Sequence, residues 1–153
     1  GNLFLSIATW CRSTKAGKVF SAPVEVYESD ERVVQPDILF VSNGRLGIIK
    51  QKRIEGAPDL VIEISSPSTK SRDLNEKRDL YERIGVREYW FVEYEKRRVH
   101  VFVLGAERSE PEARGAAAFS LGRFAPARLV EDRTILTTPV MPGLEIPLIE
   151  IWA

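Results

Sequence analysis

The spacing of apolar residues along the chain predicts short strands mixed with helices. At the start, apolar residues recur at helical intervals, which predicts an amphipathic helix over residues 2–15. Its buried stripe would consist of Leu3, Ile7, Trp10 and Cys11. Alternating or continuous apolar runs predict strands at 19–20, 24–27, 35–41, 58–65, 89–92, 99–103, 117–121 and 134–138.

Two segments of the chain, a strand and the helix after it, bear on the candidate site. Residues 58–65 form a nearly unbroken apolar run, the pattern of a central strand that is covered on both faces. A helix is expected from about residue 71 to Ile84, with Gly85 as its C-terminal stop. Residues 42–57 are loop-like. The whole length of 153 residues fits one α/β domain with one core.

Composition narrows the class of protein. Hydrophobic residues make up 44% and charged residues 29%, as in an ordinary globular protein. Acidic and basic residues number 22 each, and this balance still permits nucleic-acid binding through a local basic surface. No apolar run approaches the ~20 residues of a membrane helix, and no signal peptide opens the chain. A cytoplasmic protein without a membrane partner is therefore expected.

Cysteine and histidine each occur once. Cys11 has no partner for an intrachain disulfide, and a zinc site built from several Cys or His residues is excluded within one chain. A Ser-His-Asp site would need His100, which lies in an alternating strand, and the chain has no Gly-x-Ser-x-Gly turn. His100 is expected to be a strand residue at the sheet surface.

The most informative feature is an acid inside the central strand. Because side chains alternate along a strand, Glu63 shares a face with Asp59 and Val61, opposite the apolar residues of the other face. An unpaired buried charge is very costly, so this strand requires a metal or a basic side chain near Glu63.

The following helix offers such a partner. At about 100° per residue, Lys77 falls in the middle of an apolar stripe that must fold back onto the sheet. The stripe consists of Leu74, Lys77, Tyr81 and Ile84. Asp37 follows a proline and begins a second apolar strand of the same sheet. Two carboxylates and a lysine that converge predict a site for Mg²⁺ or Mn²⁺ and phosphodiester hydrolysis.

Two bland interpretations stay open beside this one. In the first, Glu63 and Lys77 would form a buried ion pair that only fixes the packing of the helix. The basic side chains near the site in sequence either contact a DNA backbone or belong to ordinary solvated loops. These side chains are Lys50, Lys52, Arg53, Lys70 and Arg72.

Several segments together carry a resemblance to a known family. They are residues 35–41, 56–69, Asp73, Lys77, Tyr81, 85–90 and 142–148. With them, nearly the whole chain resembles the Uma2 family of restriction-endonuclease-like proteins. The resemblance implies the PD-(D/E)XK nuclease fold, a mixed β-sheet flanked by helices. Asp37 matches the acid of its first motif and Glu63 the acid of its second. Ser65 stands where the usual lysine would follow, and Lys77 is the candidate for that role.

The expected function is that of a metal-dependent endonuclease which hydrolyses DNA phosphodiester bonds. Asp37 and Glu63 would bind the metal, and both would act in catalysis with Lys77. The alternatives are a catalytically inactive nuclease-fold module for nucleic-acid or protein binding, and an assembly protein. The resemblance also implies one domain over residues 1–153 that lacks the family's N-terminal elements. A homodimer is among the assemblies left open.

Overall fold

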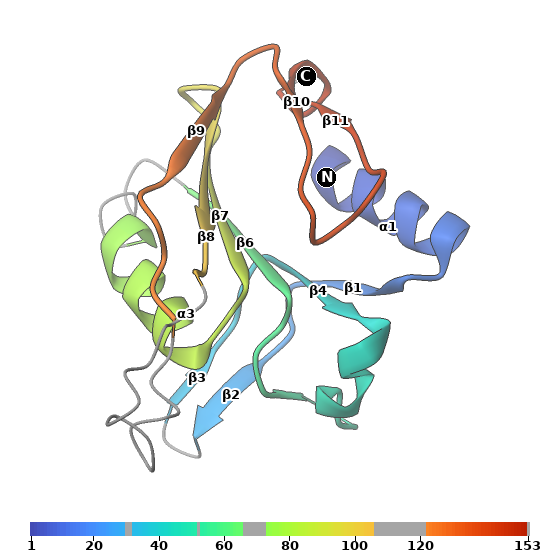
Figure 1. Cartoon of the computed structure of the whole chain (residues 1–153), viewed down its shortest axis with the longest axis vertical. Helices are drawn as coiled ribbons and strands as arrows, with labels where there is room; N and C mark the ends of the chain where they lie inside the picture. The colour runs from blue at the N-terminus through green and yellow to red at the C-terminus, as the bar shows by residue number, and fades with distance from the viewer. Residues whose placement is uncertain (30–31, 52, 66–72, 106–121, 153) are drawn as a thin grey trace.

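A six-stranded mixed sheet organises the computed structural model, which describes residues 1–29, 32–51, 53–65, 73–105 and 122–152 (Figure 1). The strand order is β1-β4-β6-β7-β8-β9. Among the described strands of this six-stranded sheet, only β6 and β7 pair in parallel, and the other neighbours are antiparallel. The strands are β1 (Gly17–Ser21), β4 (Ile38–Ser42), β6 (Leu60–Ile64), β7 (Glu88–Glu93), β8 (Arg98–Val103) and β9 (Arg128–Glu131).

The first face of the sheet packs against the two ends of the chain. The helix α1 (Asn2–Thr14) covers it together with the C-terminal segment, in which β10 (Ile135–Leu136) pairs with β11 (Ile146–Pro147) (Figure 1). A short 3₁₀ turn, η5 (Leu148–Glu150), follows. Apolar side chains of these elements and of the sheet form one buried cluster, which supplies the larger part of the core.

The second face packs against α3 (Arg78–Ile84) and a smaller sheet. The π-helical turn η2 (Asp73–Lys77) leads directly into α3. The smaller sheet has the order β3-β2-β5. Its strands are β2 (Val26–Ser29), β3 (Arg32–Val34) and β5 (Ile54–Glu55), and a 3₁₀ helix, η1 (Asn43–Ile48), precedes β5.

Strand alternation decides which side chains meet which layer. In β6, Leu60 and Ile62 belong to the cluster beneath α1, whereas Val61 belongs to the cluster beneath α3. Glu63 therefore faces α3, because residues two apart in a strand share a face. All four of these residues are buried, as the apolar run predicted for a central strand.

Much of the expected order of elements is confirmed. The helix at the N-terminus buries Leu3, Ile7, Trp10 and Cys11, the four residues of its predicted stripe. The hairpin of β7 and β8 is present. Gly85 adopts a φ of 96° and ends α3, a conformation that a side chain would disfavour.

Other expectations were wrong or only partly right. Residues 42–57 are not simply loop, since they contain η1 and β5. The described part of the helix expected from residue 71 begins as a π-helical turn and is α-helical from Arg78, and β3 and β9 were not predicted. In β9 only Val130 is buried, so the strand carries almost no apolar signal. The strand expected at 117–121 and the helix start expected at 66–69 lie outside the described residues.

None of the helices in the described part of the chain combines the length and the apolar composition that a membrane crossing requires.

Candidate active site

Asp37 and Glu63 lie beside each other at one end of two central strands. Ile38 pairs with Ile62 across the antiparallel strands β4 and β6, and the two acids come one step beyond this pair. Directly opposed residues have Cβ atoms about 4.5–5.5 Å apart. The carboxylate oxygen Oδ2 of Asp37 also accepts a hydrogen bond from the amide of Ile64 at 2.7 Å, which ties the two strand ends together.

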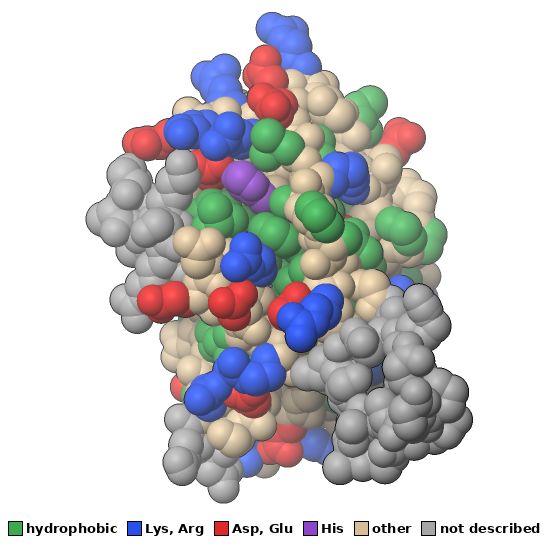
Figure 2. All heavy atoms as spheres, turned by 60° about the vertical axis from the view of Figure 1, so that its left-hand side comes forward, with side chains coloured by type: hydrophobic (Ala, Val, Ile, Leu, Met, Phe, Trp, Pro, Cys, Tyr) green, Lys and Arg blue, Asp and Glu red, His purple; other side chains and the backbone are tan. Residues whose placement is uncertain are grey.

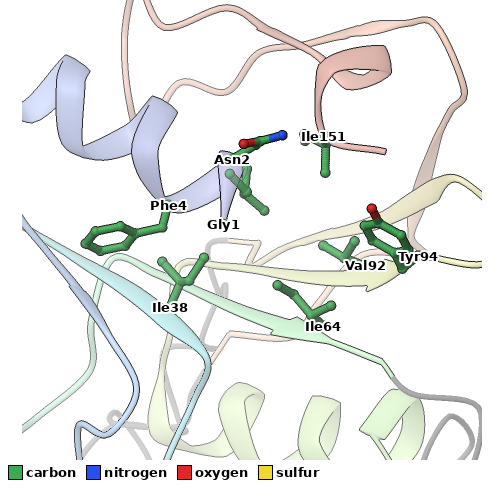
Figure 3. A pocket seen from close by; sticks show the side chains of 9 residues that line it. Gly1, Asn2, Phe4, Ile38, Ile64, Val92, Tyr94 and Ile151 are labelled. Carbon is green, nitrogen blue, oxygen red and sulfur yellow. The ribbon is translucent and has the colours of Figure 1, made fainter. Parts of the chain in front are cut away.

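The neighbouring apolar residues show which way the acids point. Ile38 and Ile64 each follow one of the two acids, and their side chains point into an apolar pocket beneath α1 (Figure 3). This pocket has a volume of about 260 Å³. Since successive side chains of a strand alternate, Asp37 and Glu63 project from the other face, toward α3.

The carboxylate of Glu63 is almost fully enclosed and has two partners on one oxygen. Its residue is 2% exposed. The hydroxyl of Tyr81 donates a hydrogen bond of 2.6 Å to Oε2. The Nζ atom of Lys77 lies 3.2 Å from the same oxygen. Both partners therefore hold Oε2, while Oε1 has no hydrogen-bond partner among the described residues.

Helical periodicity explains why Lys77 and Tyr81 arrive together. They are four residues apart, so they lie on the same side of the helical segment. Tyr81 is buried, whereas residues of the opposite side such as Asn75, Glu76 and Asp79 are exposed. Lys77 is the last residue of the π-helical turn and precedes the first residue of α3. Such π-turns are frequent at functional sites.

Burial dominates the electrostatics of this cluster. It raises the pKa of Glu63 to about 7, with the charge of Asp37 acting in the same direction. The hydrogen bond from Tyr81 and the charge of Lys77 favour the ionised form but do not outweigh burial. Burial and the Glu63 charge also raise the pKa of Tyr81 well above its ordinary value, so Tyr81 remains a hydrogen-bond donor.

The donor atoms fit a hard divalent cation. Oδ1 of Asp37 and Oε1 of Glu63 are carboxylate oxygens without hydrogen-bond partners in the described part of the chain. Mg²⁺ commonly binds one or two carboxylates and completes its shell with waters and substrate phosphates. Among the described residues no group of three His, Cys, Asp or Glu side chains forms a closed metal cage. The pair thus suits an open site for Mg²⁺ or Mn²⁺ rather than a structural metal centre.

The contact that the helix stripe predicted between Lys77 and Glu63 is confirmed. The assignment of metal-binding and catalytic roles to Asp37, Glu63 and Lys77 stays a prediction. Ser65 occupies the position of the usual lysine, and its amide donates a hydrogen bond to the carbonyl of Val92. The amine near Glu63 comes instead from Lys77, which directly precedes α3.

Sequence reasoning missed the part that Tyr81 plays. Tyr81 was placed on the inward stripe but was given no polar partner. The signal was available, because a tyrosine one helical turn after Lys77 on the same stripe must bury its hydroxyl near the acid that Lys77 meets. A buried hydroxyl usually finds a hydrogen-bond partner.

The basic residues expected near the site divide into two groups. Lys50 is exposed, and Arg53 is engaged by Glu55 at 2.5 Å and lies 4.0 Å from the centre of the Tyr27 ring. Both border a groove on the smaller sheet. Lys52, Lys70 and Arg72 lie outside the described residues. Their contact with a DNA backbone stays a prediction.

The mixed sheet, with layers on both faces and an acid at the end of each of two adjoining strands, defines a mixed α/β domain. A solved structure described as "a putative nuclease belonging to DUF820" from Anabaena variabilis has the same fold, with a TM-score of 0.71 over 99% of this chain and 76% of that chain. At 14% sequence identity this likeness concerns the fold alone. The sequence profile of the Uma2 family, described as "Putative restriction endonuclease", matches residues 1–148. The chain belongs to the Uma2 family. No curated protein matches it.

Proposed function

We propose that the protein is a metal-dependent endonuclease that hydrolyses phosphodiester bonds of DNA. One observation carries the proposal: the buried carboxylate of Glu63 stands beside Asp37, and each acid keeps one oxygen without a hydrogen bond in the described structure. The description of the Uma2 family and that of the solved structure with the same fold both name a nuclease, which supports this choice of reaction.

A purely structural ion pair accounts less well for these groups. Lys77 is present, yet burial and Asp37 still raise the pKa of Glu63 to about 7. A pair that existed only for packing would gain from a single acid, because a second carboxylate adds repulsion. Shifted carboxyl groups of this kind gather at functional sites, where a bound cation or substrate compensates the cost.

Each side chain has a distinct task in the proposed reaction. Asp37 and Glu63 would bind Mg²⁺ or Mn²⁺, which supplies a more acidic water and stabilisation of phosphoryl charge. Tyr81 holds Oε2 of Glu63 and would leave Oε1 available to the cation. The Lys77 side chain is 30% exposed, so its amine can contact Glu63 and still reach a substrate or an attacking water. There it would orient the water or offset the charge that develops on the phosphate.

The test is Mn²⁺ binding by calorimetry together with Mn²⁺-dependent nicking of plasmid DNA. Glu63→Gln and Asp37→Asn are expected to lose both, while their folds persist by circular dichroism. Glu88→Gln is a matched control, because Glu88 is another buried strand acid, bonded by Trp90 and Thr138 instead of α3. It should keep both properties. Nicking that survives in Glu63→Gln would sink the proposal.

Ser65 favours a second candidate, a nuclease-fold module that binds without cleaving. The position two residues after Glu63 carries no amine, and a half-buried serine cannot supply its charge. This candidate predicts metal binding that depends on Glu63 without any nicking, under conditions in which single- and double-stranded substrates have both been tried. The calorimetric and nicking assays therefore separate the two functions.

A further inference from the structure

A groove of about 590 Å³ flanks α3 on the side that faces β8. Lys77 and Tyr81 reach Glu63 of β6 on the other side of the helix. Figure 2 shows this face, with the single histidine of the chain lying among hydrophobic side chains and charged groups around them. The volume lies within the range of about 300–1,000 Å³ that is typical of small-molecule sites. The side chains that matter below are Arg78, Glu82, His100, Phe102, Arg123 and Phe124.

Strand register relates the groove to the carboxylates. Glu63 pairs with Phe91 across β6 and β7, and Phe91 pairs with His100 across β7 and β8. The three residues form one row across the sheet. With neighbouring strands about 4.8 Å apart, His100 lies about 10 Å from Glu63 along this row. Phe91 in the middle of the row is fully buried in the cluster beneath α3, so a strand that contacts both ends of the row has to pass over the helix.

A buried carboxylate fixes the imidazole of His100 at the floor of the groove. Oε1 of Glu93 accepts a hydrogen bond from Nε of Arg98 at 2.6 Å and lies 2.5 Å from Nε2 of His100. Because a carboxylate oxygen accepts hydrogen bonds, Nε2 is the ring nitrogen that carries a proton in this contact, and Nδ1 is the second polar atom of the ring. Nδ1 has no hydrogen-bond partner among the described residues. It is a polar atom to which the edge of a nucleobase can form a hydrogen bond.

The walls of the groove combine aromatic surface with two arginines and two acids, of which Asp79 is paired with Arg78 at 3.2 Å. The rings of Phe102 and Phe124 lie 5.8 Å apart between centroids. The amide of Phe124 donates to Oε2 of Glu82 at 2.6 Å, which holds this wall against α3 and engages the acid. Arg123 is exposed, and no carboxylate of the described residues lies within ion-pair distance of it. Apolar rings beside an arginine that has no carboxylate partner among the described residues suit a base and its phosphate.

We propose that this groove binds an unpaired nucleotide of the substrate strand, across α3 from the phosphodiester that is cleaved. The substrate class would then be DNA with a single-stranded segment. A base inside a duplex is stacked on both faces and paired at its edge, so it cannot enter the groove, whereas an unpaired base can. This inference rests on the proposed function, whose metal and cleavage site lies on the other side of α3.

The test is the affinity for a short fluorescent oligonucleotide in EDTA, measured by anisotropy for the single strand and for the same strand annealed to its complement. Ala125→Trp fills the groove, and Arg123→Glu reverses the charge of its exposed arginine. Each should weaken single-strand binding by about tenfold or more. Arg12→Glu is the matched control, because this exposed arginine lies on α1, across the sheet. It should change the affinity by less than about twofold.

Two results would overturn the groove assignment. One is equal affinity for single strand and duplex, and the other is wild-type affinity in both Ala125→Trp and Arg123→Glu. The assay contains no free divalent metal, so it reports the groove independently of Glu63. Mn²⁺-dependent nicking that requires Glu63, together with wild-type binding by both Ala125→Trp and Arg123→Glu, would leave the proposed function standing and remove the groove.

Discussion

Tyr81 donates a hydrogen bond of 2.6 Å to Oε2 of Glu63, and both side chains are buried. The bond crosses from α3 to the central strand β6 and joins the helix to the candidate site. Hydrogen bonds to charged groups contribute about 1.5–3 kcal/mol. Because this bond favours the ionised form of Glu63, we expect it to act on the proposed cation binding as well as on packing.

Tyr81→Phe is expected to raise the pKa of Glu63 above its present value of about 7 and to weaken Mn²⁺ binding at neutral pH. Calorimetry with Mn²⁺ measures the effect. Tyr94→Phe is the matched control, since it also removes a tyrosine hydroxyl, here one that donates to the Trp152 carbonyl at 3.0 Å. Equal Mn²⁺ affinities in the two variants would contradict the assigned role of Tyr81.

The affinity for Mn²⁺ should rise with pH around neutrality. A carboxyl group must lose its proton to bind the cation, and burial raises the pKa of Glu63 to about 7. The apparent affinity is thus expected to be about tenfold higher at pH 8 than at pH 6. Calorimetry in buffers of different ionisation enthalpy would also detect the released proton. An affinity that is flat between these pH values would refute the assignment.

Stability without metal should respond to pH in the opposite direction. The pKa of Glu63 rises from 4.5 to about 7 on folding, so the native state binds the proton more tightly. The contribution of this group is complete below pH 4.5 and is lost as the pH rises to about 7. At about 1.4 kcal/mol per unit this is about 3 kcal/mol.

Urea denaturation in EDTA at several pH values tests this linkage. Glu63→Gln should remove the contribution. Between pH 4.5 and 7, the free energy of unfolding of the wild type should therefore fall relative to that of Glu63→Gln. Parallel curves for the two proteins would show that Glu63 titrates alike in both states.

Lys77→Met should separate catalysis from cation binding. The Lys77 amine lies 3.2 Å from Glu63, and removing one stabilising donor from an active site costs about 10²–10³ in rate. Nicking is expected to fall by at least about 10²-fold. At pH 8, where Glu63 is ionised, Mn²⁺ should still bind. Lys18→Met, on the exposed side of β1, should nick at the wild-type rate. Undiminished nicking by Lys77→Met would remove the lysine from the mechanism.

The sequence predicted which face of each element points inward better than it predicted which side chains are in contact. Lys77 was placed toward Glu63 because helix and strand periods are local and strict. The bond from Tyr81 was not predicted, since it depends on where α3 lies across the sheet. The contact of Glu93 with His100 likewise depends on the register of a hairpin, which the alternating pattern alone does not define.

Short elements with weak apolar signals were also beyond prediction. In β9, Leu129 is exposed and only Val130 is buried, so the strand is defined by pairing with β8 rather than by its own pattern. The 3.6-residue period of an α-helix does not predict the π-helical turn before α3. Tertiary contacts determine both features.

A crystal structure with Mn²⁺ tests the central claim most directly, because the anomalous signal locates the ion. The account predicts one strong peak within bonding distance of Oδ1 of Asp37 and Oε1 of Glu63, with the Lys77 amine remaining beside Oε2. It also predicts that the peak disappears in Glu63→Gln. Crystals soaked at saturating Mn²⁺ that show no peak between the two acids, or a Lys77 amine turned into bulk solvent, would contradict it.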